Sequence, residues 1–509
     1  MSKVPPNIQP PTPEEIRELA AEHYMDLTDE EVQDFEELIA ATLAGYERLD
    51  ELSVTDPALE YTNRDPGYKP DIEEDPLNAF VRKCEVKGAE SGPLAEYDVG
   101  LKDNISLAGV EMTCGSKLFE GYVPETDATV VTRLLDAGAT ITGKLNMEDM
   151  AFSGSGELSA TGPVRNPHDP DYIAGGSSSG SIAAVVNEDV DVAMGGDQGG
   201  SVRIPAAWSG GVGHKPTHSL VPYTGIAGLG RSFDHTGPMT RSVSDCARVL
   251  EVIAGKDPGD PRQGNVPTDN YTDALDGSAA DITVGVVEEG FGHDQSEPGV
   301  DSTVRNALAS FEAAGADVQE VSIPMHLDGL PIWNAIATEG TMATVEAEGV
   351  GYNANGHYDT QFMEAFARAR RSRADDYLTT VKLTLITGQY LSDTYNSHYY
   401  AKAQNLSQEL ASRYDSALAD VDVLAMPTTP QTAHEYRSDL SRMEVVDRAL
   451  NMLPNTAPFD VTGHPALSVP AGTSNGLPVG LMFVGDQFDD ATVLQAGHAF
   501  EQSVEPNGL

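Results

Sequence analysis

Basic residues are scarce in this 509-residue sequence, which has 31 Lys and Arg against 80 Asp and Glu and a net charge of −49. Such a chain should repel nucleic acid and anionic membrane surfaces, so we expect neither as a partner. The acidic residues are scattered over many segments instead of forming one tail, a pattern that halophilic proteins use on their surfaces. We therefore predict a salt-adapted protein from a halophilic source.

Cysteine and long apolar runs are also rare. The three cysteines, Cys84, Cys114 and Cys246, are far apart and form no C-x-x-C pair, which argues against a zinc site or a disulfide framework. No run of about 20 apolar residues occurs, and the first residues lack the apolar stretch of a signal peptide. We expect a cytoplasmic protein with free, buried thiols.

Two helix starts open the chain. Thr12 with Glu15, and Thr28 with Glu31, have the spacing of capping boxes, and apolar residues at helical spacing follow the second. We predict a helical hairpin over residues 10–54 and a linker over 55–78, giving an N-terminal helical extension (1–78) and a main domain (79–509). The hairpin could serve as a dimer contact or a pocket lid, or could simply pack on its own core.

The main domain alternates helical and strand patterns. A helical pattern over 128–138 precedes a strand pattern over 139–144, and the same order recurs at 304–323 and 406–426. The run 96–101 is short and β-prone, so it could place Lys102 at the end of a strand. This alternation favours an α/β fold built around a sheet.

Two loops rich in glycine and serine stand out, at 175–181 and 196–201. Neither fits a phosphate-binding pattern, because GxxxxGK[ST] is absent and no GxGxxG follows a strand. Residues 176–180 match G-x-S-x-G, but a polar turn with two prolines stands where a nucleophile elbow needs a buried strand. Tight glycine turns can instead direct several N–H groups at an anion, as acyl transfer at a serine requires.

Several segments match the pattern of one known family. They are GLKDN at 100–104, GGSSSGS at 175–181, GDQGGSVRIP at 196–205, GHKPT at 213–217, MPTTP at 426–430 and GLPVGL at 476–481. From about Glu85 to its end the sequence resembles the amidase signature family. The resemblance implies a mixed central β-sheet covered by helices on both faces. Ser179 departs from the usual glycine. Many family members have threonine at position 198, and the glutamine found here resembles the stand-alone amide hydrolases rather than the tRNA-dependent transamidation subunits.

The resemblance also implies a Ser-cisSer-Lys triad. Ser201 matches the nucleophile, Ser177, 24 positions upstream, matches the bridging serine, and Lys102 matches a base that must be neutral at rest. The implied oxyanion donors are the N–H groups of Gln198, Gly199, Gly200 and Ser201. No metal and no organic cofactor are implied. Spacing alone leaves open a Ser201-His-Asp triad that uses His214, His218 or His235 beside Asp234.

The favoured function is a stand-alone amidase, which hydrolyses a small carboxamide to a carboxylic acid and ammonia through an acyl-enzyme. The first alternative is the glutaminase (A) subunit of a tRNA-dependent amidotransferase, and a remote one is a non-catalytic amidase-like binding protein. A homodimer is plausible for the family. Candidates for the substrate pocket are Phe152, Ser153, Gly154, Ile332, Trp333 and Phe459. For the four aromatic and aliphatic side chains among them, an ordinary core position is the favoured interpretation.

Overall fold

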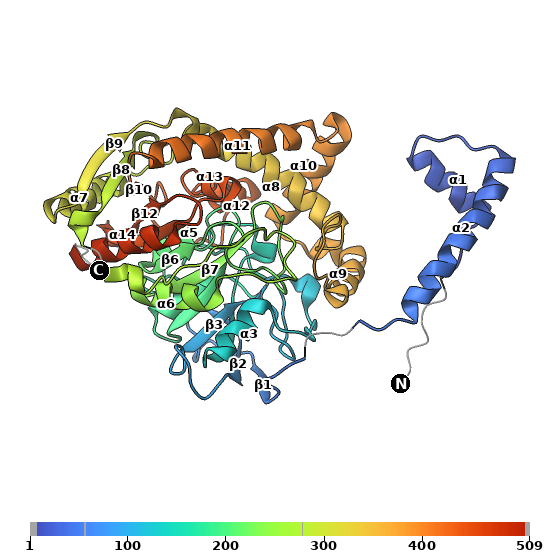
Figure 1. Cartoon of the computed structure of the whole chain (residues 1–509), viewed down its shortest axis with the longest axis horizontal. Helices are drawn as coiled ribbons and strands as arrows, with labels where there is room; N and C mark the ends of the chain where they lie inside the picture. Colours follow the sequence, from blue (N-terminus) through green and yellow to red (C-terminus); the bar gives the residue numbers. More distant parts are fainter. Residues whose placement is uncertain (1–7, 55–57, 277, 504–509) are drawn as a thin grey trace. The chain divides into compact units, whose positions relative to one another are not determined.

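The computed structural model describes residues 8–54, 58–276 and 278–503, and it divides into two compact units after Ala58. The first unit contains α1 (Pro13–Glu22) and α2 (Asp29–Asp50), which confirms the predicted helical hairpin (Figure 1). Both capping boxes are present, because Thr12 and Thr28 each accept the N3 backbone N–H while Glu15 and Glu31 accept the cap N–H. Each helix therefore starts where its capping residue predicts.

The second unit is built on one mixed sheet of twelve strands among the described residues (Figure 1). The strands are β1 (Arg64–Tyr68), β2 (Phe80–Lys87), β3 (Asp98–Lys102), β4 (Thr140–Leu145), β5 (Val192–Asp197), β6 (Val212–Lys215), β7 (His235–Thr240), β8 (Thr283–Val287), β9 (Asp317–Val321), β10 (Val423–Pro427), β11 (Ala466–Ser474) and β12 (Leu477–Val484). Their order is β1-β2-β4-β3-β5-β7-β6-β11-β12-β10-β8-β9. The helix-then-strand patterns of the sequence thus mark strands of a single sheet.

Helices cover both faces of this sheet. They are α3 (Thr129–Asp136), α4 (Ser179–Val186), α5 (Arg203–Ser209), α6 (Val243–Ile253), α7 (Pro298–Ala313), α8 (Gly329–Glu346), α9 (Thr360–Arg373), α10 (Thr379–Tyr395), α11 (His398–Leu418), α12 (Arg442–Leu450), α13 (Pro458–Thr462) and α14 (Asp490–Ser503). Neighbours on β12 belong to different core clusters: Phe483 packs on Phe311 of α7 and Phe500 of α14, whereas Met482 lies in the other cluster, in contact with Arg203 of α5. This alternation is the two-residue period of a strand buried on both faces.

Residues 55–57 of the predicted linker over 55–78 lie outside the described part of the chain, and part of the remainder is a strand. Residues 64–68 form β1, which pairs antiparallel with β2, so residues from Leu59 onward belong to the second unit. Arg64 fixes this segment, since its guanidinium forms a buried ion pair with Asp127 at 2.6 Å. The Asp, Pro and Tyr content of this segment is also typical of a linker. A short strand at the edge of a sheet can have the same composition, because proline is tolerated there.

Strand β3 lies between β4 and β5 and runs parallel to both. Carboxyl ends of parallel neighbours meet at the same edge of a sheet. Lys102, the last residue of β3, is thereby placed beside the end of β5, from which the second Gly/Ser loop continues. No helix among the described residues has both the length and the apolar character to cross a membrane.

Candidate active site

Lys102 is completely buried at the end of β3. Its Nζ lies 2.8 Å from Ser177 Oγ and donates to the carbonyl of Gly196 at 3.1 Å. Burial lowers the pKa of Lys102 to about 7, although the negative charge of Asp197 acts in the opposite direction. A substantial fraction of the lysine is therefore a neutral amine at neutral pH.

The first Gly/Ser loop carries Ser177 against the end of β5. Ser177 follows a cis peptide bond from Gly176 and stands just before α4. Its neighbour Ser178 hydrogen-bonds both backbone groups of Gly196, at 3.0 Å and 3.1 Å, and its N–H donates to the carbonyl of Ser201 at 3.3 Å. Ser178 thus joins the two loops through backbone contacts, as expected for a serine in a tight loop.

The second loop is shaped by a buried ion pair between Asp197 and Arg203. The carboxylate accepts the Arg203 Nε–H at 2.9 Å and the N–H groups of Gly200 and Val202 at 2.6 Å and 3.1 Å. Arg203 also donates to Asp460 at 2.8 Å. Burial by itself would raise the pKa of Asp197, but the Arg203 charge outweighs it and holds that pKa below its usual range. Asp197 and Arg203 thus support the loop.

The hydrogen bonds of this loop correct the predicted oxyanion donors. The N–H of Gly200 is engaged by Asp197, so Gly200 is not available as a donor. The carbonyl of Gln198 accepts the Trp333 indole N–H at 2.6 Å, and in a trans peptide the next N–H, that of Gly199, points the opposite way. Within the described structure the N–H groups of Gln198, Gly199 and Ser201 donate to no other residue. These three are the remaining candidates.

Glycine is required at position 199 by the approach of Trp333. A Cβ on Gly199 would lie 2.8 Å from Cζ2 of that indole. The carbonyl of Gly199 is fixed as well, since it accepts the Thr456 hydroxyl at 2.7 Å. Residues from α8 and from the segment before α13 therefore fix the carbonyls of Gln198 and Gly199.

The histidine alternatives do not assemble at Ser201. His214 lies 3.0 Å from Asp490, while His218 and His235 contact the carbonyls of Arg231 and Phe233, also at 3.0 Å. Burial lowers the pKa of His218 to about 3 and that of His235 well below its usual value. Of the titratable side chains considered, Lys102 is the one that contacts a serine hydroxyl of the two loops.

Ser201 opens onto a small cavity. Four of the predicted pocket residues line it, namely Phe152, Ser153, Gly154 and Trp333. The rest of its lining is Ala151, Gln198, Gly199, Leu229, Phe233, Ala337, Leu450 and Leu453. The lining contains no charged side chain, so the site is suited to an uncharged, largely apolar group beside the serine.

Ile332 and Phe459 lie outside this cavity, contrary to the prediction that they line the substrate pocket. Ile332 is 3% exposed, and as the neighbour of Trp333 on α8 it points about 100° around the helix, into the core. Phe459 is completely buried and packs on Tyr414 with ring centroids 4.8 Å apart. Both side chains are part of the packed core, the interpretation that the sequence had favoured.

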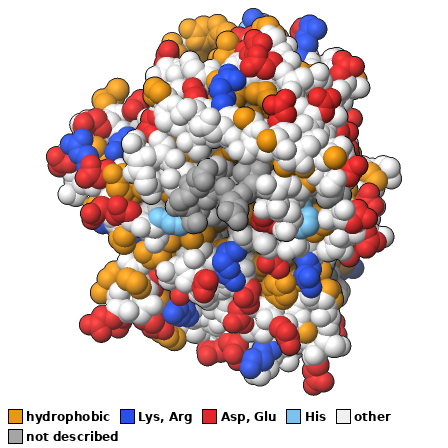
Figure 2. Space-filling view, turned by 90° about the vertical axis from the view of Figure 1, so that its left-hand side faces the viewer, with side chains coloured by type: hydrophobic (Ala, Val, Ile, Leu, Met, Phe, Trp, Pro, Cys, Tyr) orange, Lys and Arg blue, Asp and Glu red, His pale blue; other side chains and the backbone are white. Residues whose placement is uncertain are grey.

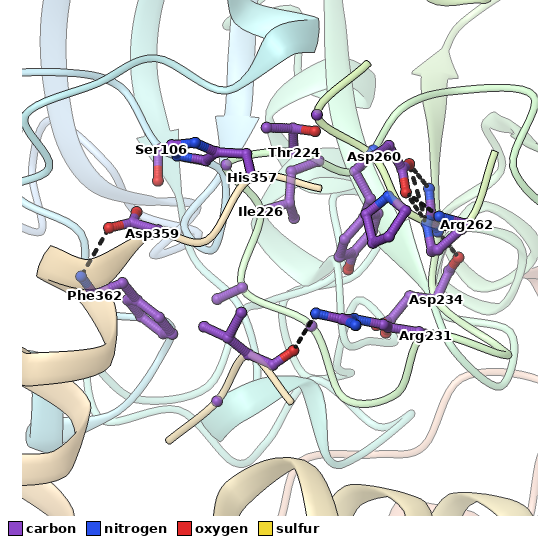
Figure 3. Close-up of a pocket in the computed structure, with 18 of the residues that line it drawn as sticks. Ser106, Thr224, Ile226, Arg231, Asp234, Asp260, Arg262, His357, Asp359 and Phe362 are labelled. Carbon is purple, nitrogen blue, oxygen red and sulfur yellow. Dashed lines mark hydrogen bonds and ion pairs between the residues drawn. The ribbon is translucent and has the colours of Figure 1, made fainter. Parts of the chain in front are cut away.

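A larger hollow is lined by residues of the segment 223–231 together with Asp260, Arg262 and Asp359 (Figure 3). Figure 3 shows Arg231 and Arg262 on one side of it and Asp359 with Phe362 on the other. A small cavity shares Ala227 and Gly228 with this hollow and shares Leu229 with the Ser201 cavity. The three spaces thus follow one another along residues 223–231.

The family model described as Amidase matches residues 78–494, most of the chain and all of the segments described above. The chain belongs to the amidase family. This membership confirms the amidase signature fold and an amide hydrolase as the class of enzyme.

Known relatives include both a stand-alone amidase and an amidotransferase (A) subunit, the two alternatives that the sequence suggested. An enantioselective amidase of Rhodococcus rhodochrous is 44% identical over 505 residues, which cover 98% of this chain and 96% of that protein. The glutamyl-tRNA(Gln) amidotransferase (A) subunit of Natronomonas pharaonis is 41% identical over 429 residues, covering 83% of this chain and 99% of its own length. The crystal structure of the corresponding Thermotoga maritima protein has a TM-score of 0.71 at 32% identity and covers 85% of this chain and 89% of that one.

Proposed function

We propose that this chain hydrolyses carboxamides with Ser201 as nucleophile, Ser177 as proton bridge and Lys102 as base. The observation that supports it most strongly is the completely buried Lys102 amine, 2.8 Å from Ser177 Oγ. A serine hydroxyl attacks an amide only when a neighbour removes its proton, and a lysine can do so only when it is neutral. Burial supplies that neutral amine near pH 7.

Acylation begins when Ser201 attacks the substrate carbonyl. Its proton moves to Ser177, while the Ser177 proton moves to the Lys102 amine. The developing oxyanion accepts hydrogen bonds from the N–H groups of Gln198, Gly199 and Ser201. Each such donor typically lowers the activation free energy by about 3 kcal/mol. The lysinium then returns a proton through Ser177 to the leaving nitrogen, so that ammonia departs and an ester remains on Ser201.

Deacylation uses the same groups in the same order. Water attacks the ester and gives its proton through Ser177 to Lys102. As the tetrahedral intermediate collapses to the carboxylic acid, the lysinium returns that proton through Ser177 to the departing Ser201 oxygen, which leaves the free hydroxyl. Because Lys102 ends each half-reaction in its starting state, protons and charge balance over one turnover.

The cavity favours a stand-alone amidase over a glutaminase subunit. Free glutamine carries an ammonium and a carboxylate, and burying either one without a partner is costly. The cavity at Ser201 offers no charged side chain to either group, whereas Phe152, Phe233 and Trp333 offer apolar surface. We infer an uncharged aliphatic or aromatic acyl group.

The extent of similarity supports the same choice. The alignment with the Rhodococcus amidase covers all but 2% of this chain, so it includes the residues of the helical hairpin. Almost the whole Natronomonas protein, 99%, matches only 83% of this chain. We propose that the hairpin mediates a homodimer, because within it only Ile16, Ala20 and Val32 are buried, which leaves most of its apolar side chains to be covered.

The setting of the enzyme is also a proposal. We propose a cytoplasmic protein, because Cys84, Cys114 and Cys246 are all free and buried. Side chains of Asp and Glu are spread over the face shown in Figure 2 and far outnumber Lys and Arg in the sequence. This charge supports a salt-adapted protein that binds no nucleic acid.

Ammonia release by the purified single chain tests the choice of function. A panel of propionamide, hexanamide, benzamide and glutamine, assayed in molar KCl, separates the candidates. We expect release from the uncharged amides and little or none from glutamine. Release from glutamine alone would point to the glutaminase of an amidotransferase, and release from none of the four would favour the non-catalytic binding protein.

A further inference from the structure

Three potential metal ligands meet on the surface of the second unit, away from the Ser201 cavity. Asp415 belongs to α11, His464 lies between α13 and β11, and Asp486 follows β12. One ligand atom from each lies within 4.8 Å of the other two. Segments that are 49 and 22 residues apart thus converge on one point.

We propose that Asp415, His464 and Asp486 bind a divalent transition-metal ion that fastens α11 to the ends of β11 and β12. One imidazole nitrogen and two carboxylate oxygens suit Zn²⁺ or Mn²⁺ better than the all-oxygen preference of Ca²⁺ or Mg²⁺. Ligand bonds of about 2.1 Å in tetrahedral or octahedral geometry place ligand atoms about 3 to 4 Å apart. The observed spacing requires only a small contraction to reach that range.

His464 is held in the orientation that metal-binding histidines have. Its side chain is completely buried, and Nδ1 lies 3.0 Å from the Thr462 hydroxyl. When Nδ1 donates to Thr462, the lone pair of Nε2 points at Asp415 Oδ1, which is 3.0 Å away. When the proton is on Nε2, the imidazole donates an ordinary hydrogen bond to Asp415, and a metal ion that displaces this proton would bind between the same two atoms.

The two carboxylates have no other positive partner in the described structure. Asp415 forms an ion pair only with His464, and Asp486 forms none with a lysine or arginine. Gln487, the residue after Asp486, holds the backbone of Thr462 in place, because its side chain donates to the Thr462 carbonyl at 2.7 Å. The site therefore combines concentrated negative charge with a fixed, buried imidazole.

Titration with metal ions tests this site on the full-length protein. After EDTA treatment and removal of the chelator, we expect Co²⁺ to give a saturable absorption spectrum at one ion per chain. Zn²⁺ or Mn²⁺ should raise Tm by about 2 to 4 °C, while Mg²⁺ should not. Asp415→Asn and Asp486→Asn should each weaken binding at least about tenfold. Both positions are exposed, so these variants should fold.

Asp420→Asn is the matched control, because Asp420 is an exposed aspartate near the end of α11 that lies outside the cluster. It should bind Co²⁺ as the wild type does. Equal binding by the wild type and the Asp415→Asn, Asp486→Asn double variant would overturn the proposal. The absence of any saturable binding to the wild type would overturn it as well. Neither outcome bears on the amidase function, which involves none of the three ligands.

Discussion

At the residue scale, burial alone does not mark the base. Of the eleven lysines in the sequence, Lys102, Lys144 and Lys215 are completely buried in the described structure. Lys144 donates to the carbonyl of Ile105 beside Asp103, and Lys215 donates to the carbonyl of His464 at 2.7 Å. Only Lys102 among these three contacts a hydroxyl, so what distinguishes it is its contact with Ser177.

The pH dependence of kcat/KM follows from the pKa of Lys102. The base works only as a neutral amine, so kcat/KM should rise about tenfold per pH unit below about pH 7 and level off above it. Burial also raises the pKa of Glu148, which supports the neighbouring loop, to about 7. Glu148→Gln removes that titration, and the rise should persist in this variant. Its disappearance would assign the profile to Glu148 instead.

Two phenylalanines should respond differently to truncation. Phe152 lines the Ser201 cavity, so Phe152→Ala should raise KM for an aromatic amide relative to an aliphatic one. Phe459 is packed on Tyr414, so Phe459→Ala should cost about 3 to 5 kcal/mol of stability and leave the ratio of the two KM values unchanged. Thermal unfolding and steady-state kinetics measure both effects. A changed ratio for Phe459→Ala would place it in the pocket.

At the element scale, the sequence predicted the elements better than it predicted their contacts. The β-prone run before Lys102 became β3, and the capping boxes gave both hairpin helices. The role of Asp197 in engaging the Gly200 N–H could not be read from the motif, because it depends on how the turn after β5 folds back. Ile332 and Phe459 were ambiguous for the same reason, since apolar side chains suit a core and a pocket equally well.

The hairpin should hold two copies of the chain together. An open cavity of the hairpin is lined by Leu19, Met25 and Phe35 with other apolar side chains. A Leu19→Glu, Phe35→Glu double variant should therefore shift the protein from dimer to monomer in light scattering, because burying two carboxylates is costly. Gln33→Glu adds charge at an exposed site of α2 and should remain dimeric. A monomeric wild type would contradict the dimer.

At the scale of the whole molecule, the charge of −49 governs the conditions under which the fold is stable. The Debye length falls from about 10 Å at 0.1 M salt to about 3 Å at 1 M, which screens the repulsion between carboxylates. We expect Tm to rise by at least about 5 °C between 0.1 M and 2 M KCl. Sucrose at equal osmolality is the uncharged control, and an equal rise in sucrose would argue against screening.

The sheet order and the cavities are properties of the whole molecule that the sequence did not predict. The alternating patterns indicated an α/β sheet, but the placement of β6 and β7 between β5 and β11 comes from long-range pairing that no local pattern records. Leu229, Phe233 and Leu453 reach the cavity from distant segments for the same reason. The catalytic candidates were accessible from sequence because their motifs are short and local, whereas the acyl pocket is not.

The most direct test of the account is ammonia release by Ser201→Ala, Ser177→Ala and Lys102→Ala beside Ser181→Ala. Ser181 is a buried serine in the first turn of α4, four residues after Ser177, and in the described structure its hydroxyl donates to the carbonyl of Met194 at 3.1 Å, so it serves as the matched control. The account predicts losses of at least about 10³-fold in kcat for the first three and near-normal turnover for Ser181→Ala. Substantial activity in Lys102→Ala or Ser201→Ala would contradict the proposed triad.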